Sequence, residues 1–240
     1  MKKFFIVIVA LAMCAGNVNA AGFDYEPEEG LSFMGIFGMN VSKLQNHPFK
    51  GKAGAQLGAR ADYMLPKAHG TYLTAGVDWT MKGGKGDVVV TDGENVYDAT
   101  GKYPLHYFEV PIRVGFRYNV IEELGFYAEI GPYFAVGVGG KHKVNISQDG
   151  SSFRDLEDTY SHKVFKNYGY PVETFQRWDA GIGFRIGAEY NNHYNLMFGC
   201  DWGLADLYRD SLRDAYKDST GENLPKVHNF NFSITFGYRL

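Results

Sequence analysis

The chain has 240 residues, a formal net charge of −3, 16% aromatic residues and 30 glycines. This length is enough for one or two soluble domains or for one barrel, and the aromatic and glycine content suits an all-β protein with tight turns. Beyond the N-terminal region no apolar run reaches the ~18 residues that a transmembrane helix needs, which excludes a helical membrane protein.

Residues 1–20 have the three parts of a secretory signal peptide. Lys2 and Lys3 are followed by the apolar run Phe4–Met13, and the segment closes on Val18-Asn19-Ala20. This order predicts cleavage after residue 20 and a mature domain over 21–240. Cleavage removes two of the 24 basic residues and none of the 27 acidic ones, so the net charge becomes −5. Such a charge argues against nucleic acid as a partner.

The two cysteines stand at positions 14 and 200. A lipoprotein interpretation would use Leu11-Ala12-Met13-Cys14, but Met13 is larger than the residue that usually precedes a lipidated cysteine. Whether Cys14 is ever lipidated is left open. After cleavage Cys200 is the single cysteine, so no intramolecular disulfide can form.

Eight segments of the mature chain alternate with a period of two, which is the period of a β-strand. They are Leu31–Ser42, Ala53–Met64, Thr71–Lys82, Tyr107–Asn119, Phe126–Gly139, Trp178–Tyr190, Leu196–Leu204 and Asn229–Leu240. Both strings of the first segment are largely apolar, and its preferred phase turns outward Phe33, Phe37, Met39 and Val41. In the other seven, none of 43 outward positions is charged, whereas the 21% charged content of the chain would give about nine.

The clearest segment is Trp178–Tyr190. Its even positions are wholly apolar, and its odd positions are Asp179, Gly181, Gly183, Arg185, Gly187 and Glu189. A membrane barrel strand points one face to lipid and the other into a narrow polar lumen, where glycine and paired charges fit. The pattern predicts an all-β fold, an eight-stranded antiparallel up-and-down transmembrane β-barrel.

The connections between these segments alternate in length. Short ones span 65–70, 120–125 and 191–195, and longer ones span 43–52, 83–106, 140–177 and 205–228. Outer-membrane barrels have short periplasmic turns and long extracellular loops, so the loops 83–106, 140–177 and 205–228 are predicted to be extracellular. A soluble periplasmic barrel that carries a lipid is the alternative fold.

Aromatic residues gather at both ends of the predicted strands. The short-turn end has Tyr63, Tyr118, Phe126, Tyr190 and Tyr238, and the long-loop end has Trp79, Phe108, Trp178 and Trp202. Two such girdles are typical of the two membrane–water interfaces of a barrel.

Several short motifs point to one family. They are Tyr107-Phe108-Glu109-Val110-Pro111, Gly131-Pro132-Tyr133, Arg177-Trp178-Asp179-Ala180-Gly181, Gly187-Ala188-Glu189-Tyr190, Gly203-Leu204 with Asp206, and Phe236-Gly237-Tyr238-Arg239-Leu240. Through them the chain resembles the PorT-like outer-membrane β-barrel domain family of Gram-negative bacteria. The resemblance implies an outer-membrane location. It implies no single activity, since most members are uncharacterised, although the name-giving member is linked to protein secretion. The final Leu240 departs from the phenylalanine that usually ends such barrels.

The inward positions carry seven basic and seven acidic side chains. They are Arg60, Lys82, Arg113, Arg117, Arg177, Arg185 and Arg239, with Asp62, Asp78, Glu109, Glu129, Asp179, Glu189 and Asp201. Side chains fill the interior of an eight-stranded barrel, and buried charges are tolerated when they are paired. We therefore predict a salt-bridged polar plug, with a permeant pathway as the alternative.

No catalytic, cofactor-binding or metal-binding residue is predicted. The seven histidines show no metal-ligand spacing, and no nucleophile motif surrounds a serine. Weak metal binding is left open for His142 and His162, which share a long loop with Asp149, Asp155 and Asp158.

The loop 140–177 is the candidate for a specific interaction. Among its charged residues it holds Tyr160, Phe165, Tyr168, Tyr170 and Phe175, and exposed aromatics amid charges suit a binding surface. The alternative is that these aromatics fold into a cap over the barrel.

The sequence thus predicts a monomeric, non-enzymatic outer-membrane barrel with a plugged polar lumen and a structural or surface-interaction role. Its expected partners are outer-membrane lipid and an extracellular or periplasmic protein. The alternatives are an accessory component of a secretion or transport machine, a small channel and a membrane enzyme.

Overall fold

The computed structural model describes residues 29–46, 50–92, 95–148, 151–152, 161–168, 172 and 174–240. Its elements are β1 (Gly30–Gln45), β2 (Lys50–Met64), β3 (Thr71–Asp92), β4 (Asn95–Ile121), β5 (Leu124–Gln148), β6 (Ser151–Ser152), β7 (His162–Lys163), β8 (Trp178–Tyr190), β9 (Tyr194–Gly203), α3 (Asp210–Thr220) and β10 (His228–Arg239). The predicted signal peptide, residues 1–20, lies outside the described residues and stays a prediction.

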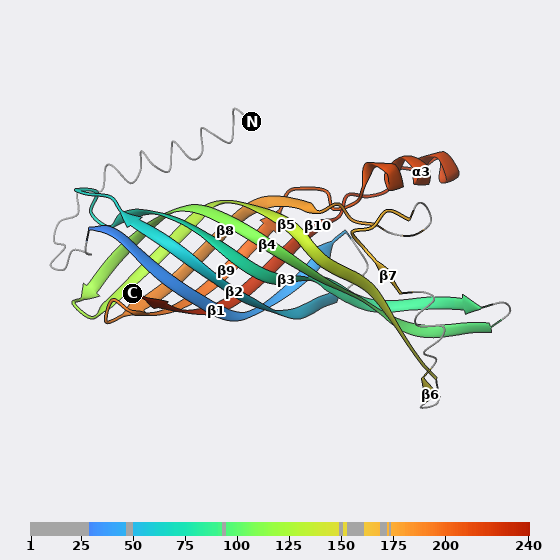
Figure 1. The fold of residues 1–240 in the computed structure, drawn as a ribbon, viewed down its shortest axis with the longest axis horizontal. Helices are drawn as coiled ribbons and strands as arrows, with labels where there is room; N and C mark the ends of the chain where they lie inside the picture. Colours follow the sequence, from blue (N-terminus) through green and yellow to red (C-terminus); the bar gives the residue numbers. More distant parts are fainter. Residues whose placement is uncertain are drawn as a thin grey trace.

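Eight strands close into a ring. Along the sheet the order is β4-β3-β2-β1-β10-β9-β8-β5, and β4 also pairs with β5. Every pairing is antiparallel, including the β1–β10 pair that joins the first and the last of the described strands. The barrel lies lengthwise in Figure 1, and the short strands β6 and β7 pair with β5 outside the ring. The predicted eight-stranded antiparallel barrel is confirmed.

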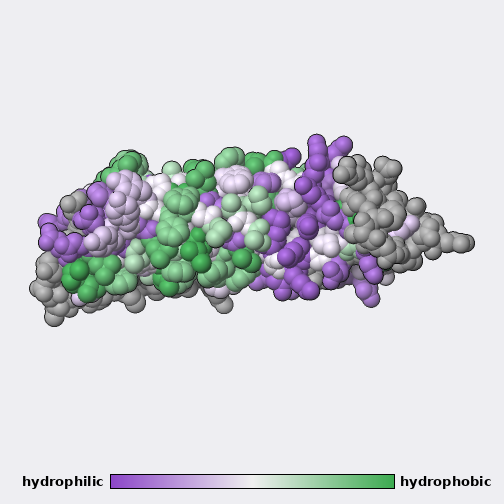
Figure 2. Space-filling model, turned by 90° about the horizontal axis from the view of Figure 1, so that it is seen from below, coloured by the Kyte–Doolittle hydropathy of each residue, from purple (hydrophilic) through white to green (hydrophobic). Residues whose placement is uncertain are grey.

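The two faces of the strands differ as the alternation predicts. On β1 the side chains of Phe33, Phe37, Met39 and Val41 are exposed, whereas Asn40 on the other face is buried. The preferred phase of the first strand is therefore correct. On the face shown in Figure 2, a hydrophobic belt covers the middle of the barrel wall and hydrophilic zones bound it at both ends. A solvent-exposed belt of this kind is what lipid covers in a membrane barrel.

Both predicted aromatic girdles lie on the outer surface. At the short-turn end, exposed rings include Tyr63, Tyr118 and Tyr190. At the long-loop end, the cross-strand register aligns Trp79 with Phe108. The same level continues through Val136 to Trp178, which is 70% exposed.

The long-loop end differs from the sequence prediction in three places. The segment 83–106 is mostly strand, because β3 and β4 stay paired up to Asp92 and Asn95. The segment 140–148 likewise continues β5, and the first connection shortens to residues 46–49. The alternation of apolar and polar residues ends with the hydrophobic belt, but the backbone pairing of the strands continues beyond it. In two of the four connections predicted to be long, the strands therefore leave only residues 46–49 and 93–94 between them. Figure 1 shows that β3 and β4 project from the barrel.

The predicted loop 205–228 contains the helix α3. The helix ends at Gly221, which has a φ of 75° and whose N–H donates to the Lys217 carbonyl, a common helix terminus. Leu212 is its buried residue. Asp206 holds the loop, since its carboxylate accepts from the Val227 N–H (3.1 Å) and pairs with Arg213 (2.6 Å). Among the described residues, no helix is long and apolar enough to cross a membrane.

Candidate functional site

The lumen holds nearly all of the predicted inward charges. Thirteen of the fourteen are buried: Arg60, Lys82, Arg113, Arg117, Arg185 and Arg239, with Asp62, Asp78, Glu109, Glu129, Asp179, Glu189 and Asp201. They come from β2, β3, β4, β5, β8, β9 and β10, so the network ties together strands that are far apart in the sequence.

The ion pairs form three levels along the barrel. Near the short turns, Arg239 contacts Asp62 and Glu189, each at 2.8 Å, and Arg117 contacts Glu189 at 2.9 Å. In the middle, Arg185 makes two parallel bonds to Asp201, at 2.7 and 2.9 Å. Two parallel N–H···O bonds are the strong geometry for an arginine and a carboxylate.

The third level lies near the long loops and is built around Lys82. Its Nζ lies 2.6 Å from Glu109 and 3.7 Å from Asp179. The same ammonium lies 4.3 Å from the centre of the Tyr133 ring, where a cation is attracted to the ring face. All three levels are closed to solvent, so each charge depends on its partner for stabilisation.

Neutral donors add to the network, since the described lumen holds six cations against seven carboxylates. The Tyr72 hydroxyl donates to Glu129 at 2.8 Å, and the Asn229 amide donates to Asp179 at 2.8 Å. The Tyr72 bond satisfies the Glu129 oxygen that faces away from the arginines, and the Asn229 bond shares its Asp179 oxygen with Lys82.

Arg177 is the one residue of the predicted inward set that lies outside the lumen. It precedes β8, where the chain has left the barrel wall, so the strand parity no longer applies. Its guanidinium is exposed, donates to the Gly137 carbonyl at 2.8 Å and lies over the Phe165 ring. The predicted balance of seven basic and seven acidic side chains in the lumen is therefore wrong, since Arg177 does not lie there.

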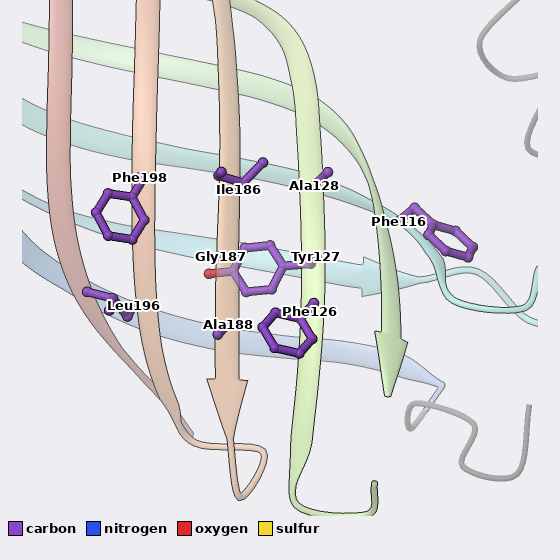
Figure 3. A pocket seen from close by; sticks show the side chains of 9 residues that line it. All are labelled: Phe116, Phe126, Tyr127, Ala128, Ile186, Gly187, Ala188, Leu196 and Phe198. Atoms are coloured by element: carbon purple, nitrogen blue, oxygen red, sulfur yellow. The ribbon is translucent and has the colours of Figure 1, made fainter. Parts of the chain in front are cut away.

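Glycines on the lumen face admit the largest side chains. A Cβ at Gly199 would meet the fully buried side chain of Arg185, its partner across the β8–β9 ladder. A Cβ at Gly187 would overlap the ring of Tyr127, which crosses this position in Figure 3. Glycine is required at both points because the close approach leaves no room for a side chain.

An apolar cluster lies at the long-loop end, next to the Lys82 level. It joins residues of the barrel wall to residues of the loops: Leu44, Tyr103, Leu105, Tyr107, Tyr133 and Ala135, with Val164, Phe165, Phe175, Leu207, Tyr208, Leu212 and Val227. Arg209 ties two loops together by donating to the carbonyls of Phe165 (2.8 Å) and Phe175 (3.1 Å).

Phe165 and Phe175 thus pack inward, as the cap interpretation of the loop 140–177 expects. Tyr168 stays exposed, and Tyr160 and Tyr170 lie outside the described residues.

The histidines 142 and 162 do come together. They face each other across β5 and β7, with ring centres 5.1 Å apart, and His142 stacks on Tyr103. The three aspartates considered with them, at 149, 155 and 158, lie outside the described part of the chain. Within that part, no group of three His, Cys, Asp or Glu side chains could hold a metal ion.

A hollow of about 500 Å³ opens on the lipid-facing surface near the short turns. Figure 3 shows its lining from β4, β5, β8 and β9, with Phe116, Phe126 and Phe198 around the small residues Ala128 and Ala188. Almost all of its lining is apolar, so an apolar group fits it better than water does.

The family model described as "Outer membrane protein beta-barrel domain" matches residues 17–209. The chain belongs to this outer-membrane β-barrel family. The protein is therefore located in the cell outer membrane, and its exposed belt is the surface that faces membrane lipid.

Solved structures of outer-membrane proteins are similar to this chain at low sequence identity. The attachment invasion locus protein Ail of Yersinia pestis is 15% identical, with 89% of this chain and 100% of that chain covered and a TM-score of 0.39. Neisserial surface protein A is 11% identical, with coverages of 88% and 99% and a TM-score of 0.43. OprG of Pseudomonas aeruginosa is 15% identical, with coverages of 90% and 97% and a TM-score of 0.40. No curated protein sequence matches the chain.

Proposed function

We propose that this protein is a closed, non-enzymatic barrel whose long-loop end faces the outside of the cell and presents a surface for a protein partner. The observation that carries the proposal is the unequal length of the strands. β3, β4 and β5 have 22, 27 and 25 residues, whereas β8, β9 and β10 have 13, 10 and 12. A membrane-spanning strand needs about 9–11 residues, so the three long strands project well beyond the bilayer.

The projecting part is an ordered sheet, which favours recognition over a purely connecting role. β3 and β4 stay in register to the end of the hairpin, and its inner side packs Ala99 against Val144 and Ile146. Among the described residues, β3 beyond Lys85 pairs with β4 alone. One edge of its backbone is thus open to an added strand, a common mode of partner binding.

The same proposal includes a lumen that does not conduct. The three levels of ion pairs and the apolar cluster beside them support it, because they occupy the width that a pore would need. Membership of the PorT-like family, the monomeric state and the lack of catalysis belong to this proposal and are supported by the sequence alone.

Photo-crosslinking in intact cells tests which end of the barrel meets a partner. One variant carries the crosslinking residue at Val89, which is 66% exposed on the projecting hairpin, and the other carries it at Glu122 in a short turn. We expect Val89 to capture a protein at the cell surface and Glu122 to capture none in comparable yield. Capture of a periplasmic complex through Glu122 alone would instead support an accessory role in a secretion or transport machine.

A further inference from the structure

A pocket of about 380 Å³ lies at the long-loop end of the barrel, where β5 leaves the hydrophobic belt. Four cations line it: Lys141, Lys163, Lys166 and Arg177. The rest of its described lining is Val138, Gly139, Gly140 and Phe165, so no acidic side chain among the described residues offsets the charge. We call this site the basic pocket.

The basic pocket lies at the level of the long-loop girdle. Arg177 is the neighbour of the exposed Trp178, and its backbone carbonyl accepts a hydrogen bond from the Gly137 N–H at 2.7 Å. Val138, on the same wall, is 47% exposed and belongs to the lipid-facing belt. Girdle residues mark the headgroup region of a bilayer, so the pocket is placed where lipid headgroups carry their phosphates.

The register of the sheet fixes the direction of the lysines. Lys141 stands directly opposite Lys163, while the neighbouring pair His142–His162 lies on the other face with Tyr103. Like charges directly opposite each other destabilise a sheet. The pair Lys141–Lys163 is therefore costly for the protein alone and becomes favourable when an anion lies between the two ammonium groups.

A second array of lysines continues the positive surface. Lys50, Lys85, Lys102 and Lys143 are successive cross-strand partners on β2, β3, β4 and β5, and all four are exposed. In the described residues none of the four forms an ion pair with an acidic side chain. Burial, followed by the charges of Lys102 and Lys143, lowers the pKa of the adjacent Lys52.

We propose that the basic pocket binds the phosphate of a glycolipid in the outer leaflet of the outer membrane. The lysines and Arg177 take the phosphate, and the acyl chains lie on Val138 and Trp178 below it. Arg177 is suited to this role because the Gly137 carbonyl and the Phe165 ring fix its guanidinium, while within the described residues its remaining N–H groups have no acidic partner. The lysine array beyond the pocket gives further phosphates of the same leaflet a favourable surface.

The test uses the full-length barrel in detergent micelles that contain a phosphorylated glucosamine lipid. The variant K141Q/K163Q removes two charges of the pocket, and K217Q/K226Q removes two exposed charges on and near α3 as the matched control. We expect the pocket variant to bind the lipid about tenfold more weakly or worse, as the loss of charge-assisted hydrogen bonds implies. The control should bind like the wild type, and the dephosphorylated lipid should bind the wild type as weakly as the pocket variant binds the intact lipid.

Inorganic phosphate, added as a competitor, separates a lipid from a free anion. Weak competition at millimolar concentration supports a lipid ligand, and affinity for inorganic phosphate equal to that for the lipid would overturn it. Equal binding by wild type and pocket variant, or equal losses in both variants, would also overturn the proposal. Heat-modifiable migration of each variant verifies that the barrel is folded. The inference rests on the proposed outward orientation of the long-loop end. Binding in micelles does not depend on that orientation, so the pocket proposal and the orientation can fail separately.

Discussion

In the lumen, small residues stand where a neighbouring large side chain occupies the space. Tyr127 is buried between strands, and its ring lies over Gly187 on the adjacent strand β8. The backbone carbonyl of Leu196 closes the other side of the same position. A closed ring of eight strands cannot widen at one point without disturbing the others, so a local overlap there has no cheap relief.

The variant Gly187→Ala tests this account. We expect it to lower the free energy of unfolding by about 1–3 kcal/mol, as overpacking of a tight interior does. Gly35→Ala is the matched control, because nothing lies within 4 Å of a Cβ at Gly35, and it should change stability little. The measurement is urea unfolding of both variants in lipid vesicles. Equal stability of the two would show that Tyr127 can move aside.

At this scale the sequence predicts most of the lumen. Strand parity alone identifies thirteen buried charges, because a period of two assigns each side chain to one face. It fails at Arg177, which has the inward parity but stands one residue before β8 begins. Parity also says nothing about partners, so the bidentate bond between Arg185 and Asp201 became visible only from the register of β8 and β9.

The strands themselves divide into a part inside the membrane and a part beyond it. Residues 83–92 and 95–103 lack the apolar outer string, because water replaces lipid there, and the sequence therefore predicted a loop. A local signal was nevertheless present: Asp92-Gly93 between Val88–Val90 and Val96-Tyr97 is typical of a hairpin turn. The helix α3 was also not predicted, because it lies in the segment 205–228, where the strand alternation has ended. Gly221, a usual helix end, was the local signal for it.

A variant with a shortened β3–β4 hairpin tests whether the part beyond the membrane can be removed without loss of the part inside it. Gly86 and Gly101 stand directly opposite each other, an even number of residues from the natural turn pair Asp92–Asn95. Replacing residues 87–100 by Asn-Gly should therefore restore a two-residue turn in the same register. We expect an unchanged barrel by heat-modifiable migration and the loss of the protein captured through the hairpin, read out by a crosslinking residue at Lys85. Failure to fold would mean that the projecting sheet is needed to close the barrel.

The whole molecule combines a lipid-facing wall, a charged interior and a one-sided extension. Length, alternation and girdles predicted the closed wall from the sequence, since the bilayer imposes the same rule on every strand. The geometry of the long-loop end could not be predicted, because its packing joins residues as distant as Leu44 and Val227. The central claim is that ion pairs and the apolar cluster close the lumen from end to end.

Conductance of the purified barrel in planar lipid bilayers tests that claim most directly. With Arg60, Lys82 and Arg185 in place, the account predicts a baseline without stable conductance steps at moderate voltage, because paired charges occupy each level of the lumen. Stable, large conductance steps from the wild-type protein would contradict it and favour a channel.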